Sequence, residues 1–244
     1  MKIITILIIA LLSYNNSSSQ NTLQGRVTYE VSYIGSIDAT AAFLKKRKTP
    51  EKDIKLILAT VRNYKNVIAT LEFANNETKY TVEKEEMSKT AITKYNKPWF
   101  VAGGNDIYYR NFSLKEYYSQ QFSFDETLLV EAVVPKWQVT QKTKKIGKYV
   151  CYKAIDLTSK NTKQKAFVWF TPEITLNSGP RHYFGLPGLI LEVKEYNYLF
   201  KAIKIELNPK KKIVIQKPTK GKKITQKELS EKIDKFWSNK RKKS

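Results

Sequence analysis

Residues 26–33 read RVTYEVSY, and the side chains in this stretch change character at every position. Val27, Tyr29, Val31 and Tyr33 are apolar or aromatic and alternate with polar residues. A period of two is typical of a β-strand with one buried face. Comparable short stretches follow along the chain, separated by turn residues every 8–12 positions, so the sequence predicts an antiparallel, mainly β fold rather than a βαβ array.

Further strands and turns are expected on both sides of the helix described below. Asn75 and Asn76 supply a hairpin turn between residues 71–73 and 80–82, and residues 103–106 (GGND) supply another turn. Residues 98–101 also suggest a strand, and residues 144–148 are expected to form a basic turn. The remaining strands are expected at residues 107–112, 117–124, 128–134, 137–139, 149–158, 165–170, 189–196, 199–207 and 213–216.

Two segments have helical spacing instead. Apolar residues recur at helical intervals after Thr49 and Pro50, which resemble an N-cap and first-turn pair and predict a helix of about four turns over residues 50–64. Near the C-terminus, Thr225 and Glu228 match a capping box ahead of the apolar stripe Leu229, Ile233, Phe236 and Trp237. The expected fold is therefore mainly β (α+β), a single curved antiparallel meander with an N-terminal covering helix and a C-terminal helix.

The first residues are typical of a secretory signal peptide. Met1 and Lys2 precede a largely apolar run over residues 3–12, and Ser17 and Ser19 are small enough for a cleavage site before Gln20. We expect residues 1–19 to be a signal peptide, 20–208 a β domain, and 209–244 a lysine-rich strand and helix extension. The mature protein is expected to be secreted, periplasmic or associated with the cell envelope, without a transmembrane segment.

Composition limits the chemistry that is available. The 244 residues include one His and one Cys, which excludes a zinc or iron–sulfur site built from nitrogen and sulfur ligands and a disulfide within the chain. The lone Cys151 is interpreted as a buried small side chain, with pairing between chains or a redox role as alternatives. Asn105 and Asp106 alone fall short of a calcium site, so no metal or cofactor is expected.

The charge of the chain is strongly positive and unevenly distributed. Lys and Arg number 44 against 22 Asp and Glu, and residues 209–244 carry a net charge of +11. Either this region is a solvated tail, or it binds an anionic lipid, a polyanionic glycan or an acidic protein; nucleic acid is not expected in an exported protein.

The most informative segment is 169–192, WFTPEITLNSGPRHYFGLPGLILE. Pro187 and Gly188 fit the central positions of a type II turn, and the three consecutive apolar residues 189–191 predict a strand that is buried on both faces.

This segment resembles the GLPGLI family of secreted envelope proteins. The resemblance rests on the blocks GGNDIYY (103–109), KTKKIGKYVCYKA (142–154) and WFTPEI (169–174), and on the structural motif residues Gly179, Pro180, Gly185, Leu186, Pro187, Gly188, Leu189 and Ile190. It implies an export signal, no established enzymatic activity, and a fold similar to the curved sheet of lipoprotein-carrier-like domains. The basic and aromatic segment Arg181, His182 and Tyr183 departs from the family pattern.

Three functions follow from these observations, in decreasing order of support. The first is a non-catalytic envelope protein whose curved sheet binds an apolar ligand or a partner protein. The second is an electrostatic envelope-association module that uses the basic C-terminal region. A distant third is a hydrolase that uses Cys151 and His182. The candidate binding residues are Arg181, His182, Tyr183, Phe184, Tyr108, Tyr109 and Tyr117.

Overall fold

A computed structural model describes residues 23–84, 96–158 and 165–242. The predicted signal peptide, residues 1–19, lies outside these residues. The described strands form one twelve-stranded sheet with the order β12-β6-β5-β4-β3-β2-β1-β11-β10-β9-β8-β7. The strands are β1 (Gly25–Tyr33), β2 (Val67–Ala74), β3 (Glu77–Val82), β4 (Ile107–Asn111), β5 (Glu116–Ser123), β6 (Glu126–Glu131), β7 (Trp137–Ile146), β8 (Tyr149–Asp156), β9 (Phe167–Thr171), β10 (Leu189–Glu195), β11 (Tyr198–Leu207) and β12 (Lys222–Ile224). The expected mainly β fold is confirmed.

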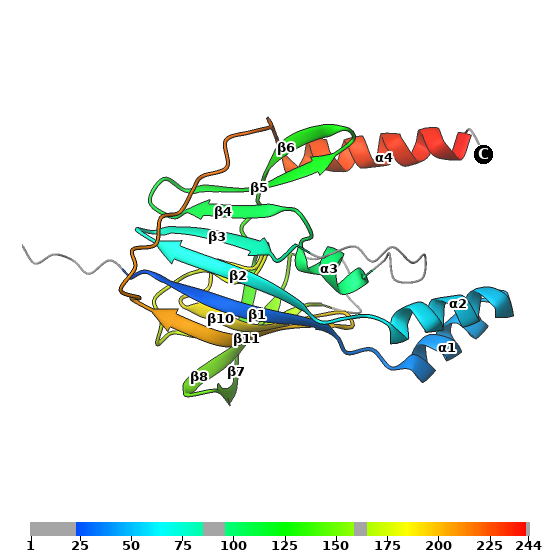
Figure 1. The fold of residues 1–244 in the computed structure, drawn as a ribbon, viewed down its shortest axis with the longest axis horizontal. Coiled ribbons are helices and arrows are strands. Elements are labelled where there is room, and N and C mark those ends of the chain that lie inside the picture. The colour runs from blue at the N-terminus through cyan, green and yellow to red at the C-terminus, as the bar shows by residue number, and fades with distance from the viewer. Residues whose placement is uncertain (1–22, 85–95, 159–164, 243–244) are drawn as a thin grey trace, which may run out of the picture.

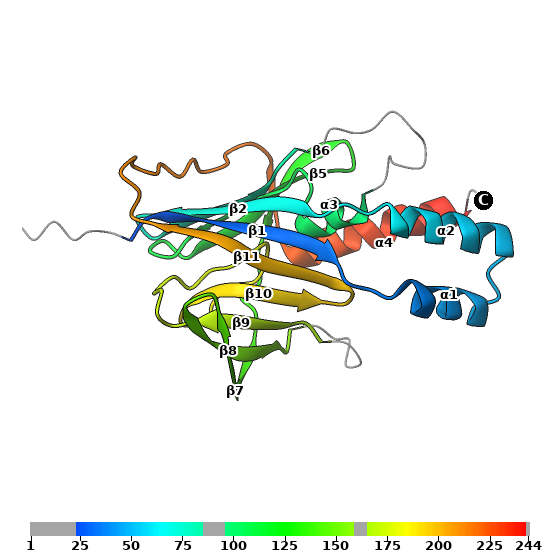
Figure 2. The ribbon, with the colours of Figure 1, turned by 60° about the horizontal axis from the view of Figure 1, so that its bottom comes forward.

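The sheet consists of two meanders joined at β1, not the single meander that was expected. Strands β2 to β6 follow one another on one side of β1, whereas β11, β10, β9, β8 and β7 follow on the other side (Figures 1 and 2). β12 pairs with β6 in parallel, so the sheet is mixed. The first strand therefore lies in the middle of the sheet and receives β2 and β11 as its two neighbours.

The alternation in β1 defines an inner face of the sheet. Val27, Tyr29 and Val31 are fully buried on this face, and Tyr29 lies opposite Ala69 of β2 and Ala202 of β11. The other side chains of β1 point to the outer face, where Arg26 forms an ion pair with Glu72. Burying one side of the strand fixes its register, because a slip by one residue would expose these apolar side chains.

The predicted hairpin between β2 and β3 is confirmed. Asn75 and Asn76 both have positive φ, 51° and 63°. Two consecutive residues in this conformation are characteristic of a type I′ turn, whose twist matches that of the flanking strands.

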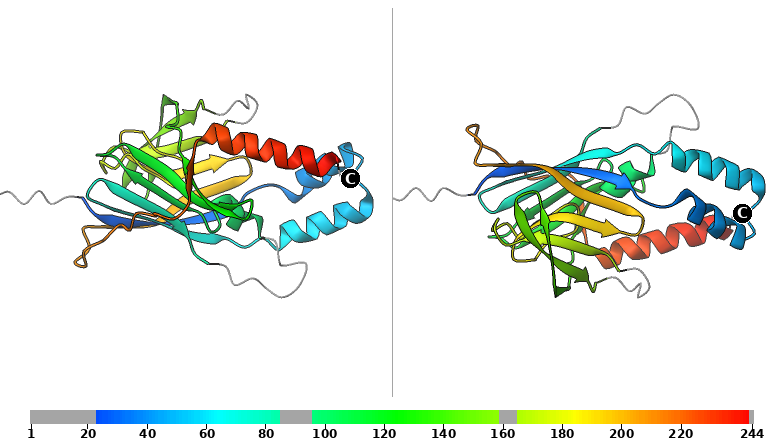
Figure 3. Two further views of the ribbon diagram at one scale, coloured as in Figure 1. Left: turned by 90° about the horizontal axis from the view of Figure 1, so that it is seen from above. Right: turned by 90° about the horizontal axis from the view of Figure 1, so that it is seen from below.

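The helices near the N-terminus differ from expectation. The predicted helix exists as α2 (Glu51–Arg62), but it packs against α1 (Ile37–Lys46), which was not predicted, and the pair extends beyond the end of the strands instead of covering the sheet (Figure 3). Residues 98–101 form part of α3 (Lys97–Ala102) and not a strand, because Pro98 favours a helix start and Gly103 ends the helix at φ 125°. It is α3 that contacts β1, β2 and β11.

The C-terminal region crosses the sheet before it ends in a helix. Residues 213–216 do not form the expected strand; residues 209–221, here called the strap, connect β11 to β12 (Figure 1). The predicted capping box is confirmed, since the Glu228 amide donates to Thr225 Oγ1 at 3.1 Å at the start of α4 (Gln226–Lys242). Leu229 of α4 packs against Leu128 and Val130 of β6.

The connection between β9 and β10 contains the hexapeptide of residues 185–190. The expected type II turn is wrong: the Gly188 amide donates to Leu186 O at 2.8 Å, which closes a tighter turn centred on Pro187, and the Leu189 amide donates to Ile174 O at 3.1 Å instead. A Cβ on Gly188 would lie 2.1 Å from Thr171 O, so the chain passes too close to β9 for any side chain. The predicted double burial is confirmed, because residues 189–191 are each 0% exposed.

Candidate functional site

A cavity of about 510 Å³ lies between the inner face of β4–β6 and the connection that follows Gly179. Its lining combines tyrosines, both kinds of charged side chain and small polar residues from distant parts of the chain. They include Asp106, Tyr108, Tyr109, Arg110, Ser119, Gln121, Asp156, Arg181, His182, Tyr183 and Glu195. We call this space the central cavity.

Arg110 is the most deeply buried charged residue of the central cavity, with 2% of its surface exposed. Its Nη1 donates to Ser178 Oγ at 3.1 Å and to Gly179 O at 3.5 Å, and its guanidinium carbon lies 4.6 Å from the ring centre of Phe184. Both acceptors are neutral, and no carboxylate of the described residues forms an ion pair with Arg110. Burial lowers the pKa of Arg110 to about 9, so the side chain still carries its charge at neutral pH.

Arg181 differs from Arg110 because its charge is compensated. Its Nη1 donates to Glu195 Oε2 at 2.8 Å, from a side chain that is 18% exposed. The backbone at Arg181 has φ 50°, a conformation that non-glycine residues adopt mainly in tight turns. Arg181 Nε is buried and has no hydrogen-bond partner within the described part of the chain.

His182 lies in the field of both arginines. Burial first, and then Arg181 and Arg110, hold the pKa of His182 well below its usual range. The imidazole is therefore neutral at pH 7, and it adds a polar group but no charge to the cavity.

Aromatic residues form the walls around these groups. Tyr108 makes an edge-on contact with Tyr80 at 5.8 Å between ring centres, and Tyr183 lies 6.3 Å from Trp137. The Trp137 indole in turn donates to Phe184 O at 2.8 Å. The Trp137 contacts hold the connection between β9 and β10 against the second meander, and the Arg110 contacts hold it against the first, so this wall of the cavity is packed in place.

Four acidic residues also line the central cavity. Burial raises the pKa of Asp106 to about 6, against the opposing effects of a hydrogen bond from Tyr108 and the charge of Arg181. Asp156, Glu131 and the paired Glu195 also line the space. The cavity lining therefore combines Arg110, which has no ion-pair partner among the described residues, with several carboxylates.

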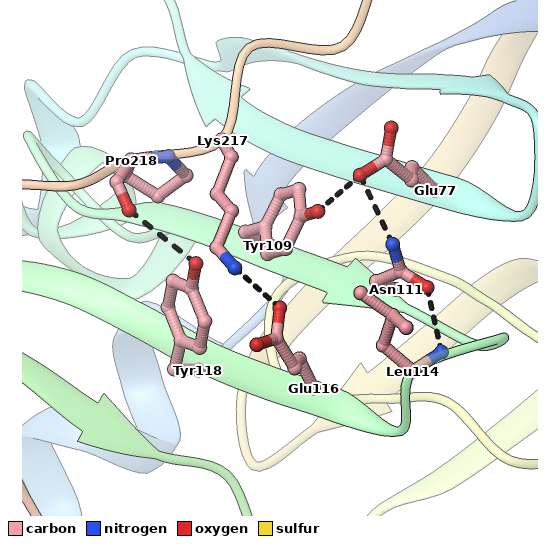
Figure 4. Close-up of polar contacts among 8 residues, drawn as sticks. All are labelled: Glu77, Tyr109, Asn111, Leu114, Glu116, Tyr118, Lys217 and Pro218. Carbon is pink, nitrogen blue, oxygen red and sulfur yellow. Dashed lines mark hydrogen bonds and ion pairs between the residues drawn. The ribbon is translucent and has the colours of Figure 1, made fainter.

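A separate polar network on the outer face fixes the strap to the sheet (Figure 4). Tyr118 donates to Pro218 O at 3.3 Å, and Lys217 pairs with Glu116 at 2.5 Å. The Tyr109 hydroxyl donates to Glu77, so its polar end is directed to this network although the residue borders the central cavity.

The structure brings the predicted binding residues together. Tyr108, Tyr109, Arg181, His182 and Tyr183 line the central cavity. Tyr117 and Phe184 do not line it, but their rings lie 5.0 Å apart, and Phe184 contacts Arg110 directly. Sequence reasoning missed Arg110, Ser119, Gln121, Asp156 and Glu195.

Only for Arg110 was a signal available in the sequence. It follows Tyr108 by two positions on a predicted strand and therefore shares the inward face of that strand.

Cys151 and His182 do not share the cavity. Cys151 is fully buried in an apolar cluster with Leu189 and Leu191, and burial raises the pKa of its thiol to about 11. A thiol in such surroundings is a poor nucleophile. The described residues contain no group of three or more His, Cys, Asp and Glu placed to hold a metal ion.

None of the helices in residues 23–84, 96–158 and 165–242 is long and apolar enough to cross a membrane.

Comparisons with known proteins give a short family match and a similar fold. Residues 158–192 match a family described as "Protein of unknown function (Porph_ging)", and this stretch contains Gly179, Pro180 and the hexapeptide 185–190. We found no match to a curated protein.

Two solved structures of PNGF-II, in space groups C2 and P21, each align with a TM-score of 0.50 at 17% identity. The alignments cover 86% and 85% of this chain but 32% of PNGF-II. The chain thus spans about a third of PNGF-II, and the likeness supports a shared β-rich fold.

Proposed function

We propose that this protein is an exported, non-catalytic envelope protein of the GLPGLI type that binds a small organic ligand in the central cavity. The observation that carries the proposal is the cavity itself, about 510 Å³ of space lined by tyrosines, Arg110, Arg181 and His182. This volume is within the range of about 300–1,000 Å³ that is usual for small-molecule sites.

The packing of the walls supports a preformed site. Arg110 of the first meander donates a hydrogen bond to Ser178, and Trp137 of the second meander donates one to the Phe184 carbonyl. Both acceptors lie in the connection after Asn177, which is therefore held from both sides. Preformed walls reduce the entropy that binding must overcome. The position of Cys151 outside the cavity supports binding rather than nucleophilic catalysis.

The test is native mass spectrometry of the protein purified after export, compared with a variant in which the cavity is filled. Ser119→Phe adds a ring at a half-buried position of the cavity wall, whereas Thr143→Phe places the same ring at an exposed position of β7 that does not line it. We expect a non-covalent mass adduct on the wild type and on Thr143→Phe that is absent from Ser119→Phe. Identical spectra for all three proteins would contradict the proposal.

A second candidate, association with an anionic envelope surface, is favoured by the exposed side of α4. Phe236 and Trp237 are 47% and 52% exposed on a helix that also carries Lys227 and Lys235. Apolar and basic side chains on one helix are typical of interfacial membrane binding. Vesicles containing phosphatidylglycerol should bind the wild type in a salt-sensitive way and bind the Phe236→Ser/Trp237→Ser variant weakly; equal binding would exclude this role for α4.

A further inference from the structure

We infer that the ligand of the central cavity is an organic molecule with a single carboxylate, and that Arg110 binds this group. The inference rests on the proposed function and adds the chemical class of the ligand.

Arg110 has no counter-charge among the described residues. A guanidinium has five N–H donors, and the two hydrogen bonds that Arg110 makes with described residues both come from Nη1 and end on neutral oxygens. Buried charges in proteins are normally paired, since an unpaired buried ion strongly destabilises the folded state. A carboxylate presents two acceptor oxygens in the geometry of the guanidinium donors, so it can accept from donors that the described residues leave unused.

The other cationic or potentially cationic groups of the described cavity lining differ from Arg110. Arg181 already pairs with Glu195 at 2.8 Å. His182 is neutral at pH 7 because burial and the two arginines depress its pKa. Arg110 is therefore the one cavity cation in the described residues that lacks an ion-pair partner.

Acidic residues of the cavity lining limit the charge that a ligand can carry. Asp106, Asp156 and Glu131 line the same cavity as Arg110. A phosphate or a polycarboxylate would gain contact with Arg110 but would be repelled by these acids, whereas a monocarboxylate matches one cation. The tyrosines on the walls, Tyr108 and Tyr183, favour an aromatic or apolar body attached to that group.

A purely structural role for Arg110 makes a different prediction. Through Ser178, Gly179 and Phe184 the side chain connects β4 to the segment 178–184. If this were its only role, the charge of a ligand would not affect binding in the wild type, and replacing Arg110 would change stability without changing ligand selectivity.

The experiment is isothermal titration calorimetry at pH 7 with 1-naphthylacetate and its uncharged amide, 1-naphthylacetamide. The two probes have nearly the same shape and differ in charge. We expect the wild type to bind the acid at least about tenfold more tightly than the amide, because a charge-assisted hydrogen bond to Arg110 forms only with the acid. Arg110→Gln should remove this preference and keep binding of the amide, and Arg110→Lys should retain part of it because lysine keeps the charge but not the planar donor pair.

The control variant is Arg26→Gln, which removes an arginine from the outer face where it pairs with Glu72. It should retain the preference of the wild type. The comparison of acid and amide in the wild type needs no variant, so it remains decisive even if Arg110→Gln does not fold. Equal affinity for acid and amide overturns the inference and leaves the proposed function intact. Failure of the wild type to bind either probe, together with the absence of a co-purified adduct, contradicts both.

Discussion

The guanidinium carbon of Arg110 lies 4.6 Å from the ring centre of Phe184, and this contact joins the two meanders across the inner face of the sheet. Arg110 belongs to β4 in the first meander, and Phe184 belongs to the connection that leads to β10 in the second. Phe184 also contacts Tyr117 at 5.0 Å. The ring therefore supports both the fold and the position of the buried cation.

Phe184→Ala should destabilise the protein strongly, because the ring is 1% exposed and its removal leaves a cavity beside Arg110. We expect the free energy of unfolding, measured by urea titration, to fall by about 3–5 kcal/mol. Phe122→Ala is the matched control, since Phe122 is 69% exposed and its loss should change stability by less than about 0.5 kcal/mol. A loss for Phe184→Ala as small as that for Phe122→Ala would contradict the predicted contribution of the ring to stability.

Gly188→Ala should disrupt the end of β9. A Cβ at this position would lie 2.1 Å from Thr171 O, so the backbone must move. Gly147→Ala provides the comparison, because Gly147 has φ 58° but nothing lies within 4 Å of its Cβ position; that change should cost about 1 kcal/mol through backbone conformation alone. Thermal unfolding should therefore show a much lower Tm for Gly188→Ala, and equal Tm values would contradict the close approach to Thr171.

Asp106 should make stability depend on pH in the acid range. Burial raises its folded-state pKa from 3.8 to about 6, so the folded protein binds this proton more tightly than the unfolded chain does. The resulting stabilisation is complete below about pH 4 and is lost as the pH rises through about 6.

Asp106→Asn should remove this dependence. Between pH 4 and 7 the wild type should lose on the order of 2 kcal/mol of unfolding free energy relative to the variant. Parallel stability curves for the two proteins would indicate that Asp106 is not desolvated.

Cys151 should be unreactive in the folded protein. Its side chain is fully buried, and burial raises the pKa of its thiol to about 11. Iodoacetamide at pH 8 should alkylate it only after unfolding in guanidinium, as measured by intact-protein mass. Alkylation of the folded protein at the rate of a free thiol would restore Cys151 as a candidate nucleophile.

Local features of the fold were predictable because neighbouring residues determine them. The alternation of Val27, Tyr29 and Val31 predicted β1, two asparagines predicted the β2–β3 turn, and Thr225 with Glu228 predicted the start of α4. The central position of β1 was not predictable, because it depends on pairing with β11, which lies far along the chain.

Short elements with few internal signals were missed for related reasons. The parallel strand β12 is stabilised by its hydrogen bonds to β6. The helix α3 is stabilised by packing against β1, β2 and β11. The segment 213–216 has apolar residues in strand-like spacing, but it pairs with no strand of the described residues and lies within the strap instead.

The candidate site was predictable only in part. The predicted residues Arg181, His182, Tyr183 and Tyr108 line the central cavity. Arg110 was passed over because a charged residue in a strand is usually solvated; its burial depends on Ser178 and Phe184, which only the tertiary fold places beside it.

The most direct measurement is a crystal structure of the wild-type protein in complex with 1-naphthylacetate. We expect electron density for the naphthyl ring in the central cavity, between Tyr108 and Tyr183, with the carboxylate in hydrogen-bond contact with Arg110. Density for the probe at another surface, with the cavity unchanged at a saturating concentration, would contradict it.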